Sequence, residues 1–308
     1  MRVFIAGGSG AVGRRMLPLL TAAGHTVVAI TRTAENVPRL RAPGVEPLVC
    51  DILDRTRLTS VVRDAAPDVI VHQVTDLPAS MNPRKLREIY ERNNRARGEG
   101  AANLIAAARA ANVRRMVVQS MATWYRPDGS DVKTEEDPLW TEAPEPIGSA
   151  VQTVVEMESA VLRDIPLAVV LRYGAFYGPG TWYARDGDIA QRVRKRGFPI
   201  VGGGITSFIH VDDAASAAVV ALDAQKSGIY NIVDDEPARA SDWLPVYARA
   251  LDAPAPFRVP VFVARLALGK PLTEWVVTMR GASNRKAREE LGWRPRYVSW
   301  RQGFYTKD

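Results

Sequence analysis

The sequence predicts an α/β fold in which helices cover both faces of a doubly wound, mainly parallel sheet of about seven strands. Short apolar runs alternate with helical patterns of about 10–15 residues along the first 175 positions, an order typical of consecutive βαβ units. The first apolar run leads directly into a cluster of glycines and then into a helical pattern, which is typical of a tight strand-to-helix turn. Right-handed crossovers place the connecting helices on both faces. These observations indicate a Rossmann-type sheet followed by a smaller C-terminal lobe.

The elements are assigned in chain order from their apolar spacing. The strands are short runs rich in β-branched residues, whereas the helices repeat apolar residues every three to four positions. We expect strands at residues 2–6, 25–31, 45–51, 67–74, 114–120 and 167–174, and helices at residues 11–23, 58–65, 98–112 and 150–164. Beyond residue 175, we expect a strand at 228–235 and helices at 242–254 and 284–293 among irregular segments.

The loss of regularity after residue 175 predicts two units. Residues 1–175 are expected to form a dinucleotide-binding domain, with a return segment at about 205–233, and residues 176–308 mainly a substrate-binding lobe. Residues 126–148 are polar and proline-rich and predict a long loop, a feature that is often functional in a compact domain.

The composition disfavours several classes of function. The net charge of +7 and the pI of about 9.7 favour anionic partners. No nucleic-acid motif is present, and a phosphorylated cofactor or scattered surface arginines account for the charge equally well. No apolar run is long enough for a membrane span, and residues 1–6 are already strand-like, so we expect no leader peptide. Cys50 is the only cysteine, which favours a reducing cytoplasm and disfavours a metal site.

The glycines between the first strand and the first helix follow the pattern G-x-x-G-x-x-G. In nucleotide-binding folds the first glycine permits a tight turn, the second lets the backbone approach a pyrophosphate, and the third lets the helix pack closely on the sheet. The N–H groups at the helix start then face the phosphates. An ordinary glycine turn is the alternative. The predicted cofactor contacts in this turn are Gly7, Ser9, Gly10, Ala11, Val12 and Gly13.

The residue after the second strand indicates which dinucleotide is bound. An acidic residue there usually holds the ribose 2′-hydroxyl, but no acid follows this strand until Glu35, and Arg32 stands in its place. An arginine with no carboxylate beside it suits a 2′-phosphate, which it can bind bidentately. NADP is therefore favoured over NAD, unless Arg32 is only a solvated surface charge. Asp51, after the third strand, can reach the adenine or cap the next helix.

Seven segments together resemble the NAD-dependent epimerase/dehydratase family of extended or atypical short-chain dehydrogenases/reductases. They are GGSGAVG, DVIVHQV, GEGAANLIAAARAANVRRMVVQS, LRYGAFYGPGT, SFIHVDDAASA, GIYNIVDDEP and REELGWRP, and they cover the chain nearly end to end. The resemblance implies a seven-stranded parallel sheet, a nicotinamide cofactor across the strand ends, and a small-molecule substrate between the lobes. It also implies homodimers formed by the helices at about 99–111 and 150–163.

The resemblance further implies roles for individual residues. Ser120, at the end of the fifth strand, would hydrogen-bond the substrate oxygen, and a strand-end serine without a catalytic role is the alternative. The implied cofactor contacts beyond the glycine turn and Arg32 are Asp51, Ile52, Gln73, Val74, Thr75, Tyr173 and Phe176. Trp182, Tyr183 and His210 would face the substrate, or would instead be structural residues.

The chain departs from this family at its proton-transfer pair, Tyr-x-x-x-Lys. No tyrosine stands four residues before any of the seven lysines. The best register places Ala150 and Val154 at the two positions, followed by Glu158. Neither Ala150 nor Val154 can carry a proton, so a reductase with this sequence needs another donor.

Four side chains from matched segments are candidate replacements: Tyr125, Tyr173, Tyr177 and His210. A tyrosine near pKa 10 can protonate a new alkoxide, and a histidine near pKa 6.5 titrates close to neutral pH. Tyr125 is favoured because it follows Ser120 closely on the same strand-end loop, and Tyr173 is the second choice.

Three functions stay open at this point. The first is an NADP-dependent oxidoreductase that acts on a small or medium carbonyl or alcohol compound, with Ser120, Tyr125 and Tyr173 as its catalytic set. The second is a non-redox isomerase, cyclase or epimerase/dehydratase-like enzyme on the same scaffold. The third is an NADP-binding redox sensor without catalysis. The fold alone does not choose among them.

Overall fold

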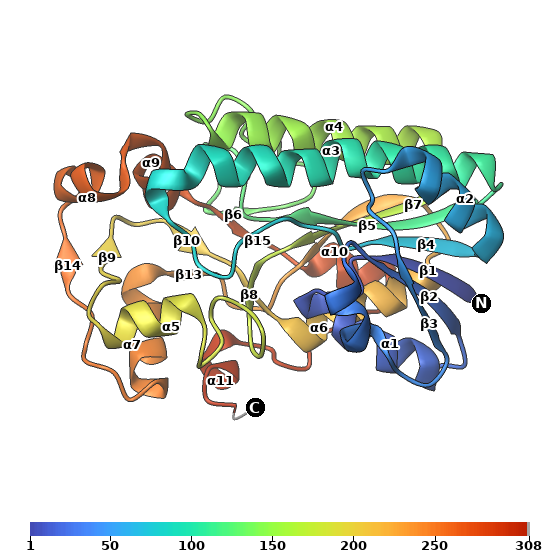
Figure 1. Ribbon diagram of the computed structural model, residues 1–308. Coiled ribbons are helices and arrows are strands. Elements are labelled where there is room, and N and C mark those ends of the chain that lie inside the picture. Colours follow the sequence, from blue (N-terminus) through green and yellow to red (C-terminus); the bar gives the residue numbers. More distant parts are fainter. Residues whose placement is uncertain (307–308) are drawn as a thin grey trace.

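Seven parallel strands form the central sheet of the computed structural model, which describes residues 1–306 (Figure 1). Their order across the sheet is β12-β7-β5-β4-β1-β2-β3. The strands are β1 (Arg2–Ala6), β2 (Thr26–Thr31), β3 (Val45–Val49), β4 (Val69–His72), β5 (Arg115–Met121), β7 (Leu167–Tyr173) and β12 (Gly228–Ile232). The order reverses between β1 and β4, and open α/β sheets bind ligands at the carboxyl ends of their strands beside such a reversal. The predicted seven-stranded Rossmann sheet is confirmed.

Five helices cover the two faces of this sheet. Helices α1 (Ala11–Ala22) and α6 (Val211–Val220) share one apolar core with alternate residues of the strands, such as Val3 and Ile5. Helices α2 (Arg55–Ala65), α3 (Leu86–Ala110) and α4 (Ile147–Asp164) share the other core with residues such as Phe4. Figure 1 shows α3 and α4 side by side above the sheet, with α1 and α6 below it.

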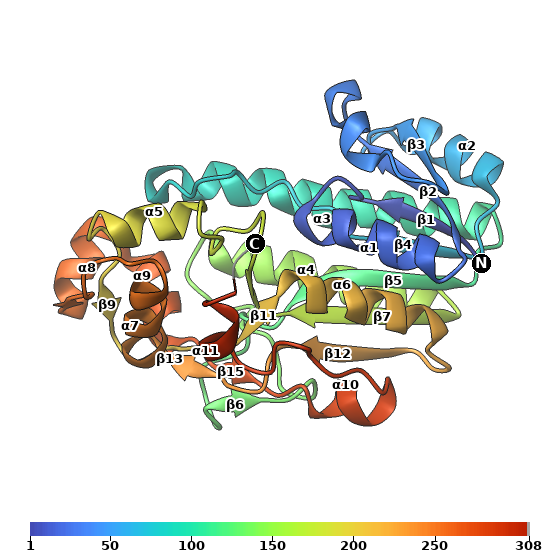
Figure 2. The same ribbon diagram turned by 90° about the horizontal axis from the view of Figure 1, so that it is seen from below.

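Shorter elements build the lobe beyond the carboxyl ends of the sheet and the connections to it (Figure 2). The strands are β6 (Val132–Lys133), β8 (Ala175–Tyr177), β9 (Ile200–Val201), β10 (Ile205–Thr206), β11 (Phe208–His210), β13 (Ala238–Arg239), β14 (Arg258–Val259) and β15 (Gly281–Ala282). The helices are α5 (Asp188–Arg194), α7 (Ala240–Ala250), α8 (Val261–Leu268), α9 (Lys270–Thr278), α10 (Arg285–Glu290) and α11 (Trp300–Gly303). Three short 3₁₀ turns are η1 (Ala34–Leu40), η2 (Pro83–Lys85) and η3 (Ala221–Asp223).

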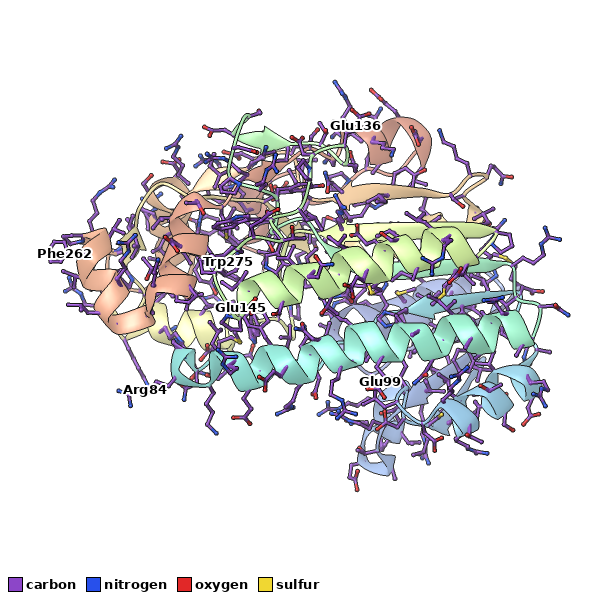
Figure 3. All side chains as sticks on the ribbon, turned by 90° about the horizontal axis from the view of Figure 1, so that it is seen from above. Arg84, Glu99, Glu136, Glu145, Phe262 and Trp275 are labelled. Atoms are coloured by element: carbon purple, nitrogen blue, oxygen red, sulfur yellow. The ribbon has the colours of Figure 1, made fainter. Side chains whose placement is uncertain are left out.

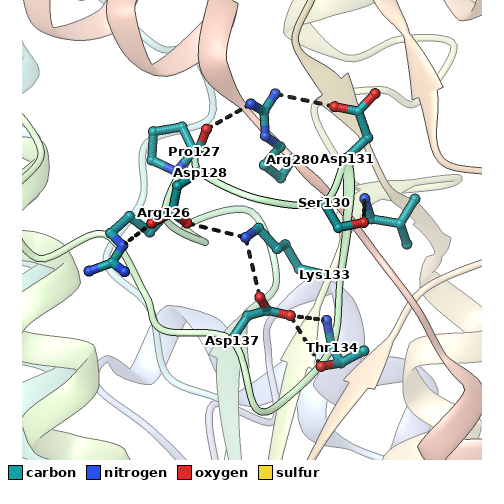
Figure 4. Close-up of polar contacts among 10 residues, drawn as sticks. Arg126, Pro127, Asp128, Ser130, Asp131, Lys133, Thr134, Asp137 and Arg280 are labelled. Carbon is teal, nitrogen blue, oxygen red and sulfur yellow. Dashed lines mark hydrogen bonds and ion pairs between the residues drawn. The ribbon is translucent and has the colours of Figure 1, made fainter.

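The long loop predicted at 126–148 is tied to the chain at several points. Its short strand β6 pairs with β15 from the C-terminal part. Lys133 in β6 is buried, and its Nζ lies 3.4 Å from Asp128 and 3.2 Å from Asp137. Arg280, just before β15, donates to a backbone carbonyl of the loop (Figure 4). The loop is therefore fixed in place by its own polar contacts rather than by apolar packing alone.

The predicted helices and strands are all present, with shifted ends. The largest difference is at α3, which begins at Leu86 rather than at residue 98. Asn93 and Arg97 occupy buried positions of its first half. Polar residues therefore stand at positions that an amphipathic helix normally fills with apolar residues. Helices α5, α8, α9 and α11 were not predicted; α8 is apolar yet exposed, with Phe262 on its outer side (Figure 3).

In residues 1–306, no helix combines the length and apolar character that crossing a bilayer requires. The division of the chain at residue 175 stays a prediction, and β12, which lies beyond it, completes the main sheet beside β7.

Candidate active site

The glycine turn between β1 and α1 is shaped for close backbone approach. Gly7 has a φ of +92°, and a Cβ there would lie 2.6 Å from the carbonyl carbon of Gln73. A Cβ on Gly13 would lie 2.7 Å from the Cα of Gly8. Gly10 is the N-cap of α1 and brings no side chain to the first turn, whose N–H groups can therefore face a phosphate. The turn, which also contains Ser9, Ala11 and Val12, fits the pyrophosphate of a dinucleotide.

Arg32 follows β2 and has a carboxylate beside it that the sequence did not reveal. Its guanidinium lies 3.4 Å from Asp76, and its side chain is 59% exposed. Asp76 comes from the loop after β4 and also accepts hydrogen bonds from Arg92 at 2.9 and 3.2 Å. Hydrogen bonds from Arg92, and then from Arg32, hold the pKa of Asp76 below its usual range. Two arginines thus share one carboxylate, and the end of β2 stays locally positive.

Asp51 and Ile52 lie just after β3. The contacts of Asp51 show whether it caps helix α2. Asp51 Oδ1 accepts the backbone N–H of Leu53 at 2.9 Å. The cap of α2 is Asp54, whose side chain accepts an N–H of the first turn. Asp51 is therefore not the helix cap. Ile52 is buried, and a Cβ on Gly100 would lie 3.0 Å from its Cγ2.

The loop after β4 meets the end of β7. Gln73, which precedes Val74 and Thr75, is buried and its Nε2 lies 3.4 Å from the hydroxyl of Tyr173. That hydroxyl donates to the backbone carbonyl of Ala214 in α6 at 3.3 Å. Burial raises the pKa of Tyr173 well above its usual value, although Gln73 opposes the shift. Phe176 packs on the Tyr173 ring, with the centroids 5.2 Å apart.

A chain of buried polar side chains lies at the carboxyl ends of β5, β7 and β12. Ser120 donates to Glu158 Oε1 at 2.5 Å. Arg172 binds the two carboxylate oxygens of Glu158 at 2.9 and 2.6 Å. Arg172 also donates to the hydroxyl of Tyr125 at 3.1 Å, and this hydroxyl donates to Asn231 Oδ1 at 2.7 Å. All five side chains are buried, so the chain of hydrogen bonds is shielded from water.

This network occupies the two hydroxyls that the sequence favours for chemistry. The proton of Ser120 is directed at Glu158, and the proton of Tyr125 at Asn231. Burial raises the pKa of Tyr125 to about 12, although Arg172 opposes the shift. A hydroxyl that donates to a protein oxygen must break that bond before it can donate to a substrate. The catalytic roles of Ser120, Tyr125 and Tyr173 stay predictions.

The positions of the missing proton-transfer pair lie on the buried side of α4. Ala150 and Val154 are fully buried and share an apolar cluster with Tyr90 and Trp124. Glu158 follows one turn later on the same helix and carries the ion pair with Arg172. The helix therefore presents methyl groups and one neutralised carboxylate where the family pair would stand.

Trp182, Tyr183 and His210, which are expected to face substrate, each contact other residues of the protein. Trp182 donates its indole N–H to a backbone carbonyl in the loop after β4 at 3.0 Å. Tyr183 packs edge-on against Phe208, with centroids 5.4 Å apart. His210 is the N-cap of α6 and accepts the N–H of Asp212 at 3.2 Å. Burial lowers the pKa of His210 to about 4, which keeps its ring neutral near pH 7. The hydroxyl of Tyr177, another candidate donor, is buried and has no hydrogen-bond partner among the described residues.

The sequence did not identify Arg172, Asn231 or Arg97 as site residues. For Arg172 the sequence did contain a signal. Arg172 interrupts an apolar strand, and a charge in such a place requires a buried partner. That partner, Glu158, comes from a different element, so the sequence shows the need for a pair but not its identity. Across the described part of the chain, no group of three or more His, Cys, Asp or Glu side chains gathers in a way that could hold a metal ion.

Comparison with known proteins gives the following relatives. The model of the NAD dependent epimerase/dehydratase family matches residues 3–233. A 3-diazoavenalumate denitrifying reductase of a Streptomyces species is 44% identical over 98% of this chain and 99% of its own length. A 4-hydroxy-2-methyl-3-oxo-4-farnesyl-3,4-dihydroquinoline-1-oxide ketoreductase of Stigmatella aurantiaca is 27% identical over 98% of this chain and 94% of its own. The human epimerase family protein SDR39U1, solved with NADPH, superposes with a TM-score of 0.77 at 20% identity, over 99% of this chain and 98% of its own.

Proposed function

This chain belongs to the NAD-dependent epimerase/dehydratase family, and from that premise we propose that it is a nicotinamide-dependent reductase that replaces an aromatic diazo group by hydrogen. The observation that carries the proposal is the absence, in residues 1–306, of a free proton donor at the positions where the family is expected to place one. The relative at 44% identity, whose name describes a diazo substrate and a denitrifying reduction, supports the choice of acceptor.

The cofactor site supports NADP as the donor. The glycine turn accepts a pyrophosphate by its shape, and Arg32 stands at the end of β2, where a 2′-phosphate would lie. Arg32 and Arg92 together carry more positive charge than Asp76 neutralises. The solved neighbour with NADPH is consistent with this choice, whereas the family description names NAD.

The chemistry of a diazonium group removes the need for a proton donor. A bound reduced nicotinamide supplies a hydride. Overall, an arenediazonium ion gains a C–H bond from that hydride, the C–N bond breaks, and its electron pair leaves with N₂. The products are the arene, N₂ and the oxidised nicotinamide, so atoms and charges balance without added acid. Reduction of a ketone instead leaves an alkoxide that must be protonated.

The protein's own residues would hold and shield the reacting ring in this reaction. The apolar cluster that contains Ala150 and Val154 would form the surroundings of the ring, and the ion pair with Arg172 neutralises Glu158 beside it. Apolar surroundings that exclude water would protect a reactive diazonium from side reactions.

The decisive experiment follows the hydride. Purified protein is mixed with NADPH carrying deuterium at both C4 positions and with 3-diazonio-4-hydroxycinnamate, and a protein-free mixture corrects for the background reaction. We expect one N₂ per NADPH consumed and deuterium on the ring carbon that carried nitrogen. Consumption of NADPH without N₂, or N₂ without deuterium transfer, contradicts the proposal.

Ketone reduction is the second candidate, because the relative at 27% identity is named a ketoreductase. It corresponds to the carbonyl substrate that the sequence predicts, and it requires Tyr125 or Ser120 to exchange a protein acceptor for the substrate. A panel of ketones assayed beside the diazonium compound separates the two. If neither acceptor is reduced while NADPH binds, the non-redox enzyme and the redox sensor become the better explanations.

Two further proposals concern the state of the protein in the cell. We propose a homodimer formed through the outer sides of α3 and α4, which lie side by side. The single cysteine, Cys50, is buried, and burial raises the pKa of its thiol to about 11. A lone, unreactive thiol supports the proposed reducing cytoplasmic location.

A further inference from the structure

Arg97 is a buried cation whose guanidinium is left largely without partners. It lies on the sheet-facing side of α3 and is 2% exposed. Its Nε and Nη1 are buried and have no hydrogen-bond partner among the residues that the structure describes. Its guanidinium carbon stands 5.7 Å from the ring centroid of Trp124. A cation–π contact satisfies none of the five N–H donors of an arginine.

Within residues 1–306, no carboxylate forms an ion pair with Arg97. Glu158 is the acid that acts on Arg97, but both its oxygens are bound by Arg172 and one also by Ser120. Burial lowers the pKa of Arg97 to about 10, so the side chain is still protonated at neutral pH. Buried charges in proteins are normally paired because an unpaired one is costly. An arginine kept in this state indicates a partner that arrives from outside.

Two ring-bearing neighbours of Arg97 also carry polar atoms without partners among the described residues. The indole N–H of Trp124 is a buried donor, and the two ring nitrogens of His72, one donor and one acceptor in the neutral ring, have no partner there either. The ring of His72 is fully buried beside Arg97, and burial, followed by the charge of Arg97, lowers its pKa to about 4. His72 therefore adds no charge at neutral pH. Unused donors around one cation match a ligand that brings oxygen acceptors and negative charge.

Two neighbours of Arg97 lie at the edge of the sheet where α/β folds bind ligands. His72 is the last residue of β4, and Trp124 follows β5, so both mark the carboxyl edge of the sheet. The strand order reverses between β4 and β1, and open α/β sheets bind their ligands beside that reversal.

We propose that Arg97 binds a carboxylate of the substrate and so makes the protein selective for aromatic acids over their neutral esters. One guanidinium matches one carboxylate in charge and in planar, bidentate geometry. A phosphate with two negative charges would require a second cation to balance it. The nearby Arg172 cannot serve as that cation, because it is already bound to Glu158. The inference rests on the proposed function for the reacting group and for the aromatic class of the acid.

Binding measurements test this without turnover. The probes are 4-hydroxycinnamate and its methyl ester, titrated calorimetrically into protein saturated with NADP⁺. The wild type is expected to bind the acid at least tenfold more tightly than the ester. Arg97→Met is expected to weaken the acid at least tenfold, leave the ester unchanged and leave NADPH affinity unchanged, and Arg97→Lys to restore part of the acid preference. Arg95→Met is the matched control, since Arg95 is exposed on the same helix and pairs with Glu99.

Thermal unfolding without ligand separates binding from a structural role. Removal of a buried, unpaired charge is expected to leave the Tm of Arg97→Met equal to or above that of the wild type. A wild type that does not prefer the acid, an acid preference that survives in Arg97→Met, a loss of NADPH binding in that variant, or a lowered Tm would each overturn the proposal. An acid preference that depends on Arg97 in a protein that releases no N₂ would instead keep this site and remove the proposed reaction.

Discussion

Arg172 and Glu158 form a bidentate ion pair in which the two side chains are 6% and 4% exposed, with the closest approach at 2.6 Å. The pair joins β7 to α4, and it holds Ser120 on one side and Tyr125 on the other. Burial lowers the pKa of Arg172, but the hydrogen bonds and charge of Glu158 outweigh it and raise that pKa above its usual value. The geometry of the Ser120–Glu158–Arg172–Tyr125 network therefore depends on this one contact.

Breaking the pair should be strongly destabilising. Glu158→Gln leaves Arg172 charged and buried without a carboxylate, and removal of one partner from such a pair typically costs about 3–5 kcal/mol. Urea unfolding of the variant and the wild type measures the difference. Glu156→Gln, at an exposed position of the same helix, is the matched control and should change the free energy of unfolding by less than about 0.5 kcal/mol. A Glu158→Gln protein as stable as this control would show that the pair is not formed.

Arg32 should decide the choice of cofactor. Arg32→Asp removes a charge-assisted contact to the 2′-phosphate, and its loss is expected to cost about 1.5–3 kcal/mol of NADPH binding. NADH affinity should change far less. Arg109→Asp carries the same change of charge at the far end of α3 and serves as the control. Calorimetry of the wild type with both cofactors is the first step, and equal affinities there would remove the role of Arg32.

The same residues show what the sequence could and could not predict. Most strands of the sheet are short, mainly apolar runs that lead into glycine or polar residues, so their positions along the chain followed from local patterns. The first half of α3 was hidden because Asn93 and Arg97 take buried positions that a pattern search expects to be apolar. The ion pairs could not be predicted from the sequence for another reason. Asp76 reaches Arg32, and Glu158 reaches Arg172, only through the fold.

Acidification should destabilise the protein through His72. Burial holds its folded-state pKa at about 4, whereas an unfolded histidine titrates near 6.5. Between these values the unfolded chain binds the extra proton, so stability is full above about pH 6.5 and falls as the pH drops towards 4. The part of the loss from pH 7 to pH 5 that His72 contributes is expected to be about 2 kcal/mol, and the buried His210, whose pKa is also lowered to about 4, adds a part of its own. Unfolding curves of His72→Asn should lack this part of the pH dependence, and those of His25→Asn should keep it.

The proposed dimer places a small residue at its centre. Ala102 is an exposed residue of α3, on the stretch of the helix that also carries Glu99, labelled in Figure 3. Ala102→Arg adds a long charged side chain that helix packing across an interface cannot accommodate, so we expect light scattering to show a dimer for the wild type and a monomer for the variant. Ala110→Arg, at the exposed end of the same helix, should stay dimeric. Light scattering that shows a monomeric wild type at micromolar concentration would contradict the proposed dimer.

Tyr125→Phe distinguishes diazonium reduction from ketone reduction most directly. If Tyr125 were the acid for a ketone, as the sequence favours, its removal would lower kcat by about a hundredfold, within the usual range of general acid catalysis. We expect instead that N₂ release keeps its rate within about threefold, because the reaction needs no proton. Stability should fall by about 1–3 kcal/mol, since Asn231 and Arg172 each lose a buried hydrogen-bond partner. Stopped-flow rates with the deuterated cofactor, set beside urea unfolding of the same samples, measure both quantities. A hundredfold loss of turnover at unchanged stability would return Tyr125 to the role of proton donor.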